Sequence, residues 1–214
     1  MRSIEIFNAV AEFGESFDAD IDHARQVSRM ALTLFDQLQP WHGMGNTERI
    51  WLRAAALLHD VAKAQDRKSH HKLARDIIID TCDLPFRREE RVLIGLVARY
   101  HRGSLPHDDH KYFADLDRDA RLYVRKLAAL LRLADGLDKG HSRLVEGLRC
   151  DVRRRNVVLR IVSRDVLSVE GVLAKADLFE QVFGRRICVH VSIDPRGFIS
   201  ALDPDASLAY ACSD

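Results

Sequence analysis

The sequence contains no long hydrophobic run and no pair of cysteines spaced as CxxC. A run of about 18 apolar residues is needed to span a membrane, and a basic segment followed by an apolar stretch marks a secretory signal. Neither is present, so no membrane partner is expected. Cys82, Cys150, Cys188 and Cys212 lie far apart, which argues against a zinc knuckle and a disulfide scaffold. These absences favour a cytoplasmic protein.

An excess of charge of one sign is also missing, because 33 Lys and Arg residues balance 32 Asp and Glu residues. The net charge therefore indicates neither a nucleic-acid nor a membrane partner. Histidine is the residue type in excess, with ten in 214 residues. Most lie between residues 59 and 110, at His59, His70, His71, His101, His107 and His110. A single histidine of this kind is usually solvated, but the cluster makes a metal or phosphate site worth testing.

The hydrophobic pattern predicts a mainly α fold in two parts. Helical periodicity predicts helices over residues 4–13, 20–38 (ended by Pro40), 47–58, 69–79, 88–101 and 119–137. After Gly147 the pattern changes, and residues 157–162 and 187–191 read as strands. A helical stretch lies between them and ends at Gly184. We expect an all-helical domain over residues 1–148 and a small β-α-β domain, an α+β appendage, over residues 149–214.

Three of the predicted helices carry an ionisable residue on an apolar stripe. His23 continues the apolar spacing of Val27, Met30 and Leu34 on the second helix. His59 on the third helix and Asp135 on the sixth continue the apolar stripes of their helices in the same way. A buried, unpaired carboxylate costs several kcal/mol, so Asp135 requires a partner. One cation held by two imidazoles and two carboxylates would satisfy all these groups. The alternative is a set of separate core histidines bonded to backbone carbonyls, with Asp135 as a helix-end carboxylate.

The order of these residues resembles the metal-ligand order of the HD superfamily, whose members are helical and mostly metal-dependent phosphohydrolases. The superfamily pattern is a histidine, a His-Asp doublet that closes a buried helix, and a late aspartate. The resemblance implies one divalent ion (Mn, Mg, Fe, Co or Ni) held by four residues: His23, His59, Asp60 and Asp135. Lys63 completes His-Asp-x-x-Lys, so Asp60 and Lys63 are the implied catalytic residues.

A narrower resemblance covers residues 5–193. The stretches at residues 23–27, 54–60, 98–102, 130–138 and 175–180 are similar to the C-terminal half of the exopolyphosphatase/guanosine pentaphosphatase family. Full-length members carry an N-terminal pair of actin-like domains that hydrolyse polyphosphate, and these 214 residues contain no counterpart. A further histidine usual near the start of the fourth helix is Leu73 here, although His70 or His71 could replace it. We therefore expect one ion, and the resemblance also suggests a homodimer.

Several cationic residues could bind substrate phosphate beside such an ion. Lys63 offers a point charge, and Arg99, Arg102 and Arg132 offer the planar fork that suits phosphate oxygens. His101 ends an apolar stripe and either faces the same cavity or stabilises the C-terminal end of its helix. The basic run at residues 153–155 is usually a solvated strand edge, but it could also bind a polyanion. No nucleic-acid reading motif or stacking platform accompanies it.

Two functions remain open from the sequence. The first is a metal-dependent phosphohydrolase of the HD superfamily that acts on a phosphoanhydride or phosphomonoester, with polyphosphate-like or nucleotide-like substrates. The second is a non-catalytic regulatory module that binds polyphosphate or an alarmone. The complete His-Asp-x-x-Lys set (His59, Asp60, Lys63) favours the enzyme, and the departure at Leu73 favours the binding module.

Overall fold

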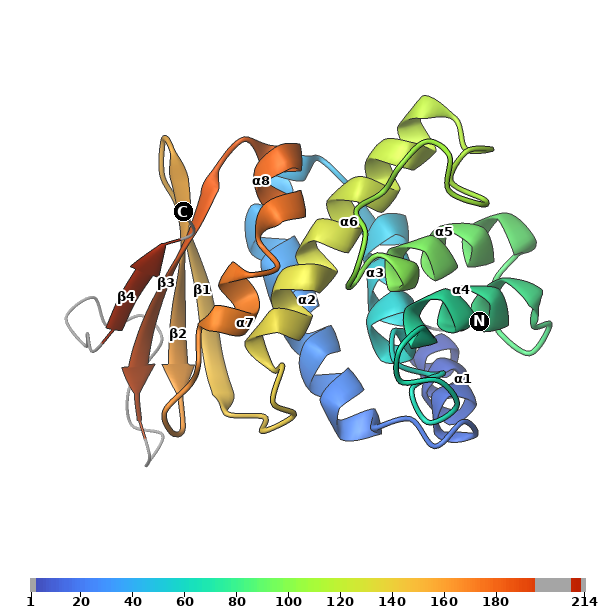
Figure 1. The fold of residues 1–214 in the computed structure, drawn as a ribbon, viewed down its shortest axis with the longest axis horizontal. Helices are drawn as coiled ribbons and strands as arrows, with labels where there is room; N and C mark the ends of the chain where they lie inside the picture. The colour runs from blue at the N-terminus through green and yellow to red at the C-terminus, as the bar shows by residue number, and fades with distance from the viewer. Residues whose placement is uncertain (1–2, 195–208, 213–214) are drawn as a thin grey trace.

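The protein was analysed as a computed structural model that describes residues 3–194 and 209–212. The mainly α fold with a small α+β part is confirmed (Figure 1). The elements follow in the order α1 (Ser3–Glu15), α2 (Ile21–His42), α3 (Asn46–Leu58), α4 (His70–Asp80), α5 (Arg88–Arg99), α6 (Arg118–Leu137), β1 (Val145–Val152), β2 (Asn156–Ser163), α7 (Glu170–Leu173), α8 (Asp177–Phe183), β3 (Arg186–Ile193) and β4 (Ala209–Cys212).

The two longest helices, α2 and α6, pack against each other at the centre of the molecule. Each begins at an aspartate whose side chain accepts a hydrogen bond from the backbone of the first turn: Asp20 from His23 N (3.1 Å) and Asp117 from Ala120 N (2.8 Å). α3 and α5 pack on this pair, α1 packs on α3, and α4 packs on α5. Nearly every residue in the second half of α6 is buried, so its polar residues there face other helices.

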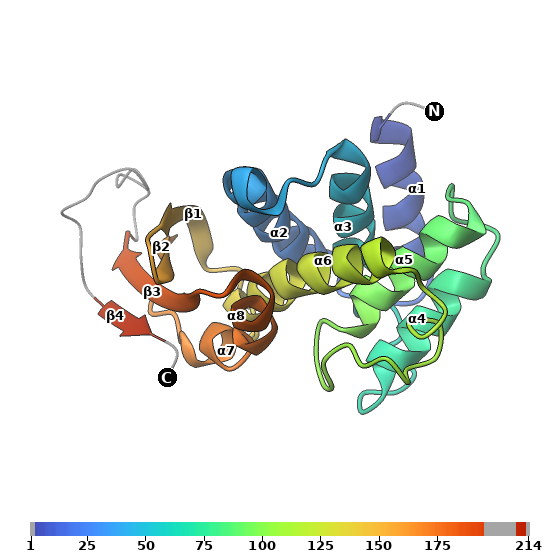
Figure 2. The same ribbon diagram turned by 90° about the horizontal axis from the view of Figure 1, so that it is seen from above.

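The strands form one sheet in the order β1-β2-β3-β4 (Figures 1 and 2). β1 and β2 form an antiparallel hairpin, β2 and β3 are parallel, and β3 and β4 are antiparallel. The short helices α7 and α8 connect the two parallel strands and lie between the sheet and α6. One hydrophobic core continues from the helices into the sheet, and the division at residue 149 stays a prediction.

Some expectations about the elements need correction. Pro40 does not end the second helix, which continues to His42 and stops at Gly43, where the left-handed backbone (φ 67°) lets its N–H bond to Gln39 O. The expected helix before Gly184 is two short ones, α7 and α8. The sequence predicts neither β1 nor β4. β1 lacks a regular alternation because a bulge lies between Val145 and Gly147.

A disulfide links Cys188 and Cys212, contrary to the sequence expectation. The antiparallel register of β3 and β4 sets these two residues opposite each other, a juxtaposition that residues 24 positions apart do not reveal in sequence. The bond removes one of the grounds for expecting a cytoplasmic protein, so that location stays a prediction. No helix in the described part of the chain is long and apolar enough to cross a membrane.

Candidate metal centre

His23 lies in the first turn of α2 and is fully buried. Its Nδ1 atom donates a hydrogen bond to Oδ2 of Asp138, the residue that ends α6, with 2.7 Å between the atoms. This bond directs the opposite ring nitrogen, Nε2, toward Oδ1 of Asp135, at 3.5 Å. His23 and Asp135 were each predicted from the apolar stripe of a different helix, and the structure brings them face to face.

His59 closes α3 and is also fully buried. Its Nδ1–H donates to the carbonyl oxygen of Ala56, at 2.8 Å, as expected for a ring held against the helix end. Its Nε2 atom therefore carries a lone pair, and it lies 3.8 Å from Asp60 Oδ2 and 3.8 Å from Asp135 Oδ1. The four predicted metal ligands thus meet in one place.

Asp60 directs its two carboxylate oxygens to different neighbours. Oδ2 accepts a hydrogen bond from the ammonium of Lys63 at 2.5 Å and faces His59. Oδ1 lies 3.0 Å from Nε2 of His70 and 3.6 Å from Nε2 of His101. The structure therefore identifies His70 as the histidine at the start of α4 that reaches the site.

Four buried histidines around the two carboxylates share one arrangement. In each, Nδ1 bonds to a fixed oxygen (Asp138 for His23, and the backbone carbonyls of Ala56, Arg67 and Ala98 for His59, His70 and His101), and Nε2 points toward the carboxylates. Metal-binding histidines in proteins are held in the same way by a hydrogen bond to their other nitrogen.

Buried polar atoms without partners test whether the site fits a metal. Within residues 3–194 and 209–212, the Nε2 atoms of His23, His59 and His70 have no hydrogen-bond partner. A buried polar atom left in this state costs about 1–3 kcal/mol. The nitrogen and carboxylate atoms of His23, His59 and Asp135 lie within 4.8 Å of one another, as do those of His59, Asp60 and His101. Imidazole and carboxylate donors suit Mn, Fe, Co, Ni or Zn, so the residues fit a divalent transition metal.

The protonation states of the buried histidines and aspartates are consistent with a cation-binding site. Burial opposes a charge on His23, but its contacts with Asp135 and Asp138 outweigh burial and raise its pKa to about 9. Burial lowers the pKa of His59 and lowers that of His101 strongly, so both present neutral rings. Burial also opposes ionisation of Asp135, but Lys175 and His23 outweigh it and lower its pKa. A cation at Nε2 of His23 takes the place of that ring's proton.

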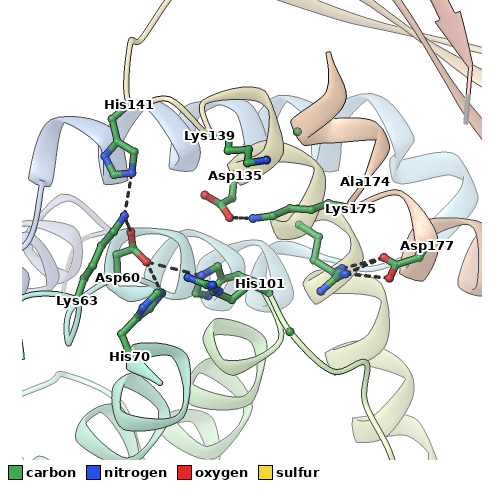
Figure 3. A pocket seen from close by; sticks show the side chains of 14 residues that line it. Asp60, Lys63, His70, His101, Asp135, Lys139, His141, Ala174, Lys175 and Asp177 are labelled. Atoms are coloured by element: carbon green, nitrogen blue, oxygen red, sulfur yellow. Dashed lines mark hydrogen bonds and ion pairs between the residues drawn. The ribbon is translucent and has the colours of Figure 1, made fainter. Parts of the chain in front are cut away.

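The carboxylates open onto a cleft of about 510 Å³ between the helices and the α7–α8 segment (Figure 3). Asp60 and Asp135 line it together with a group of cationic side chains: Lys63, Arg102, Arg132, Lys139 and Lys175. His141 lies at its edge and stacks on His23, with 3.6 Å between the ring centroids. Lys63 donates to Nε2 of His141 at 2.8 Å, and the other nitrogen of this ring donates to Asp20 at 2.7 Å.

Arg132 and Arg99, both predicted phosphate ligands, have other contacts in the structure. Arg132 lines the cleft, but its guanidinium forms two short bonds with Asp177 of α8, at 2.8 and 3.0 Å. Arg99 is not among the lining residues of the cleft; its guanidinium packs over the ring of Tyr100, at 5.3 Å. The other predicted residues, Lys63, His101 and Arg102, do line it. Phosphate binding by all of these side chains stays a prediction.

The sequence reasoning missed four residues of the site: Asp138, Lys139, His141 and Lys175. Asp138 had a detectable signal, because it lies three positions after Asp135 and so shares its helix face. His141 follows α6 in a turn, with a positive φ of 53°, and Lys175 lies between two short helices. His141 belongs to no periodic segment. Lys175 lies in the helical stretch expected before Gly184, which the structure interrupts at this residue between α7 and α8.

A second basic region lies at one end of the sheet. The basic run at residues 153–155 forms the turn between β1 and β2, where Arg153 N bonds to Asn156 O at 2.8 Å. Arg154 and Arg155 line a cavity of about 730 Å³ there together with Arg185 and Arg186.

Comparison with known proteins identifies a family for this chain. A scan of protein-family models matches the Ppx/GppA phosphatase, domain III, over residues 7–181. A search of curated proteins gives no match. The matched range includes each of the four predicted metal ligands, the whole of α2 to α7 and most of α8.

Proposed function

The chain belongs to the Ppx/GppA phosphatase domain III family, and we propose that it is a metal-dependent phosphohydrolase. The proposed substrate is a phosphoanhydride or phosphomonoester of the polyphosphate or nucleotide type. The chemistry proposed within this family is inferred from the buried histidines and aspartates of this chain. The family relationship supports a phosphatase-related role, and the site supports the metal dependence.

The observation that carries the proposal is the set of unpartnered Nε2 atoms around two buried carboxylates. Separate core histidines would satisfy both ring nitrogens, whereas His23 and His59 each bond through Nδ1 and leave Nε2 facing Asp135. The proposed ligands of the ion are His23, His59, Asp60 and Asp135. A divalent ion at such a site lowers the pKa of water and neutralises charge on a phosphoryl group.

The remaining residues of the cleft position the reacting groups. Asp60 is held ionised because the neighbouring His59, His70 and Lys63 outweigh the effect of burial and lower its pKa. An ionised acceptor at this point orients an attacking water by accepting its hydrogen bond. Lys63 keeps its contacts with Asp60 and His141 and offers its remaining N–H group to a phosphate oxygen.

Activity assays with a matched variant test the enzyme proposal. Protein loaded with Mn²⁺, Mg²⁺, Co²⁺ or Ni²⁺ is screened against inorganic polyphosphate, nucleoside mono-, di- and triphosphates and guanosine tetra- and pentaphosphate. We expect release of phosphate that is lost in Asp60→Asn, and retained in Asp36→Asn, which alters an exposed aspartate paired with Arg49. No turnover with any metal, or turnover equal in Asp60→Asn, contradicts the proposal.

The Oδ1 side of Asp60 supports a second ion. The sequence favours one ion because of Leu73, yet His70 and His101 both direct Nε2 at this oxygen. We propose that His70, His101 and Asp60 would hold this second ion. Metal content measured on wild-type protein and on His70→Ala tests this: the variant is expected to lose one ion and keep the other. Equal content in the two proteins contradicts the second site.

The arginine-lined cavity supports the alternative function of polyanion binding. Arg154, Arg155, Arg185 and Arg186 form a concentrated positive surface outside the cleft that Asp60 lines, so binding there needs no metal. Polyphosphate affinity that falls steeply with salt, survives Asp60→Asn and is lost in Arg154→Ala/Arg186→Ala favours the binding module. Affinity that depends on Asp60 and not on these arginines favours the enzyme.

A further inference from the structure

Lys175 belongs to the α7–α8 segment, outside the helices that supply the metal ligands. It lies in the turn between the two short helices, where its backbone N–H bonds to Val172 O at 3.1 Å. Its ammonium crosses to α6 and pairs with Oδ2 of Asp135, as Figure 3 shows. Lys175, which lies 40 positions after Asp135 in the sequence, thereby contacts a proposed metal ligand.

The α7–α8 segment is docked closely enough on α6 to hold Lys175 in this position. Gly136 and Gly171 bring the two backbones into contact: a Cβ atom at Gly136 would lie 2.7 Å from Val172 Cα, and one at Gly171 would lie 2.6 Å from Gly136 O. Arg132, one turn before Gly136, fixes the start of α8 through Asp177. Lys175 lies between these two attachments.

The two carboxylate oxygens of Asp135 face different partners. Oδ1 faces His23 and His59, where the proposed ion binds, and Oδ2 faces Lys175. The pairing with Lys175 therefore leaves Oδ1 for the ion. Asp60 also holds a lysine, because its Oδ2 accepts a hydrogen bond from Lys63, and the same oxygen faces His59. Each proposed carboxylate ligand thus positions one lysine at the cleft.

The charge of the cleft points to an anionic ligand. Its lining includes five cationic side chains (Lys63, Arg102, Arg132, Lys139, Lys175) and three carboxylates (Asp60, Asp135, Asp177), a difference of two positive charges. A divalent ion raises the excess further. An ammonium has three N–H donors, and Lys175 uses one of them on Asp135, which leaves donors for a bound oxyanion.

We propose that Lys175 is a second phosphate-binding residue of the cleft, placed opposite Lys63 by its contact with Asp135. This inference rests on the proposed phosphohydrolase function. The two lysines bind oxygens of the same metal-bound phosphoryl group, each from the side of one carboxylate ligand. The α7–α8 segment then contributes directly to substrate binding.

Phosphate affinity tests the role of Lys175. Orthophosphate is titrated calorimetrically into Mn²⁺-loaded wild-type protein and into Lys175→Met, Lys175→Arg and Lys63→Met. The control is Lys68→Met, which removes one exposed lysine that is not among the lining residues. We expect a loss of about tenfold or more in Lys175→Met and in Lys63→Met, as for a hydrogen bond to a charged group, and a smaller loss in Lys175→Arg. Lys68→Met is expected to bind as the wild type does.

Metal content and thermal midpoint, measured on the same samples, separate this role from others. If Lys175 only attaches the α7–α8 segment, Lys175→Met lowers the thermal midpoint and leaves orthophosphate affinity equal to that of Lys68→Met. That result overturns the inference and leaves the proposed function intact. If wild-type protein binds neither Mn²⁺ nor orthophosphate, the proposed function itself fails, and the inference falls with it.

Discussion

The Nδ1 atom of His23 lies 2.7 Å from Oδ2 of Asp138, and this contact joins the first turn of α2 to the residue that caps the C-terminal end of α6. Both side chains are almost fully buried. Asp138 is fixed in turn, because its Oδ1 accepts the backbone N–H of Arg143 at 2.7 Å. The orientation of the His23 ring, and so the direction of its free nitrogen, depends on a residue that does not itself face the proposed ion.

Replacement of Asp138 tests this dependence. We expect Asp138→Asn to weaken binding of Mn²⁺ by about 10- to 100-fold, the usual cost of losing a residue that orients a metal-binding histidine. Calorimetric titration of metal-free protein measures the change. Asp22→Asn, an exposed aspartate paired with Arg143, is the control and should bind as the wild type does. Equal affinities in the two variants would show that Asp138 does not orient a ligand.

The contact of Gly136 with Gly171 predicts sensitivity to a single methyl group. Gly171→Ala places a Cβ atom 2.6 Å from Gly136 O, so the α7–α8 segment must shift away from α6. We expect a loss of about 1–3 kcal/mol in the free energy of unfolding, typical of overpacking. Urea denaturation measures it. Gly140→Ala, where the nearest atom is 3.9 Å away, should be close to neutral, and equal stability of both variants would contradict the close contact.

His42 predicts a pH-dependent contribution to stability. Buried at the end of α2, it donates from Nε2 to Phe35 O at 2.8 Å and accepts the N–H of Met44 at Nδ1, at 3.0 Å. Nδ1 can accept only while the ring is neutral, and burial lowers the pKa of His42 in the folded protein. Below the unfolded pKa of about 6.5 the unfolded chain binds more protons, so this stability is complete above that pH and is lost as pH falls.

The measurement for His42 is a comparison of two proteins at two pH values. His42→Gln is expected to be less stable than the wild type by about 1–3 kcal/mol at pH 8, because Met44 N–H loses its acceptor. The difference should shrink at pH 5.5. A difference that stays constant or grows as pH falls would contradict a neutral His42. Both proteins contain the other histidines, so the contributions of those histidines to the pH dependence of stability cancel in the difference.

The proposed ion also predicts an effect of chelation on stability. Ligands that bind only the folded state stabilise it by about 2.7 kcal/mol at a concentration 100 times their Kd, which for a chain of this size corresponds to roughly 5–10 °C in Tm. We expect EDTA to lower the Tm of wild-type protein by this order, and added Mn²⁺ to restore it. The Asp135→Asn variant should respond less to both, because it lacks a ligand of the first ion. The same response in Asp135→Asn would place the metal elsewhere.

Residues on regular helices were predictable from sequence, whereas residues in turns were not. His23, His59 and Asp135 follow the apolar spacing of their helices, so burial of each was inferred before any contact was known. The position of Lys175 depends on how α7 and α8 dock on α6, and that docking is set by contacts between distant glycines. The choice between His70 and His71 also required the structure, because adjacent residues of one helix turn differ only in direction.

The central claim, that the buried histidines and aspartates hold a divalent ion, is tested most directly by elemental analysis of purified protein. Wild-type protein supplied with Mn, Fe, Co and Ni and then desalted is compared with His59→Ala, after circular dichroism establishes that both are folded. We predict at least one divalent ion per chain in the wild type and a loss in the variant. A metal-free wild type, or equal metal in a folded His59→Ala, would contradict the account.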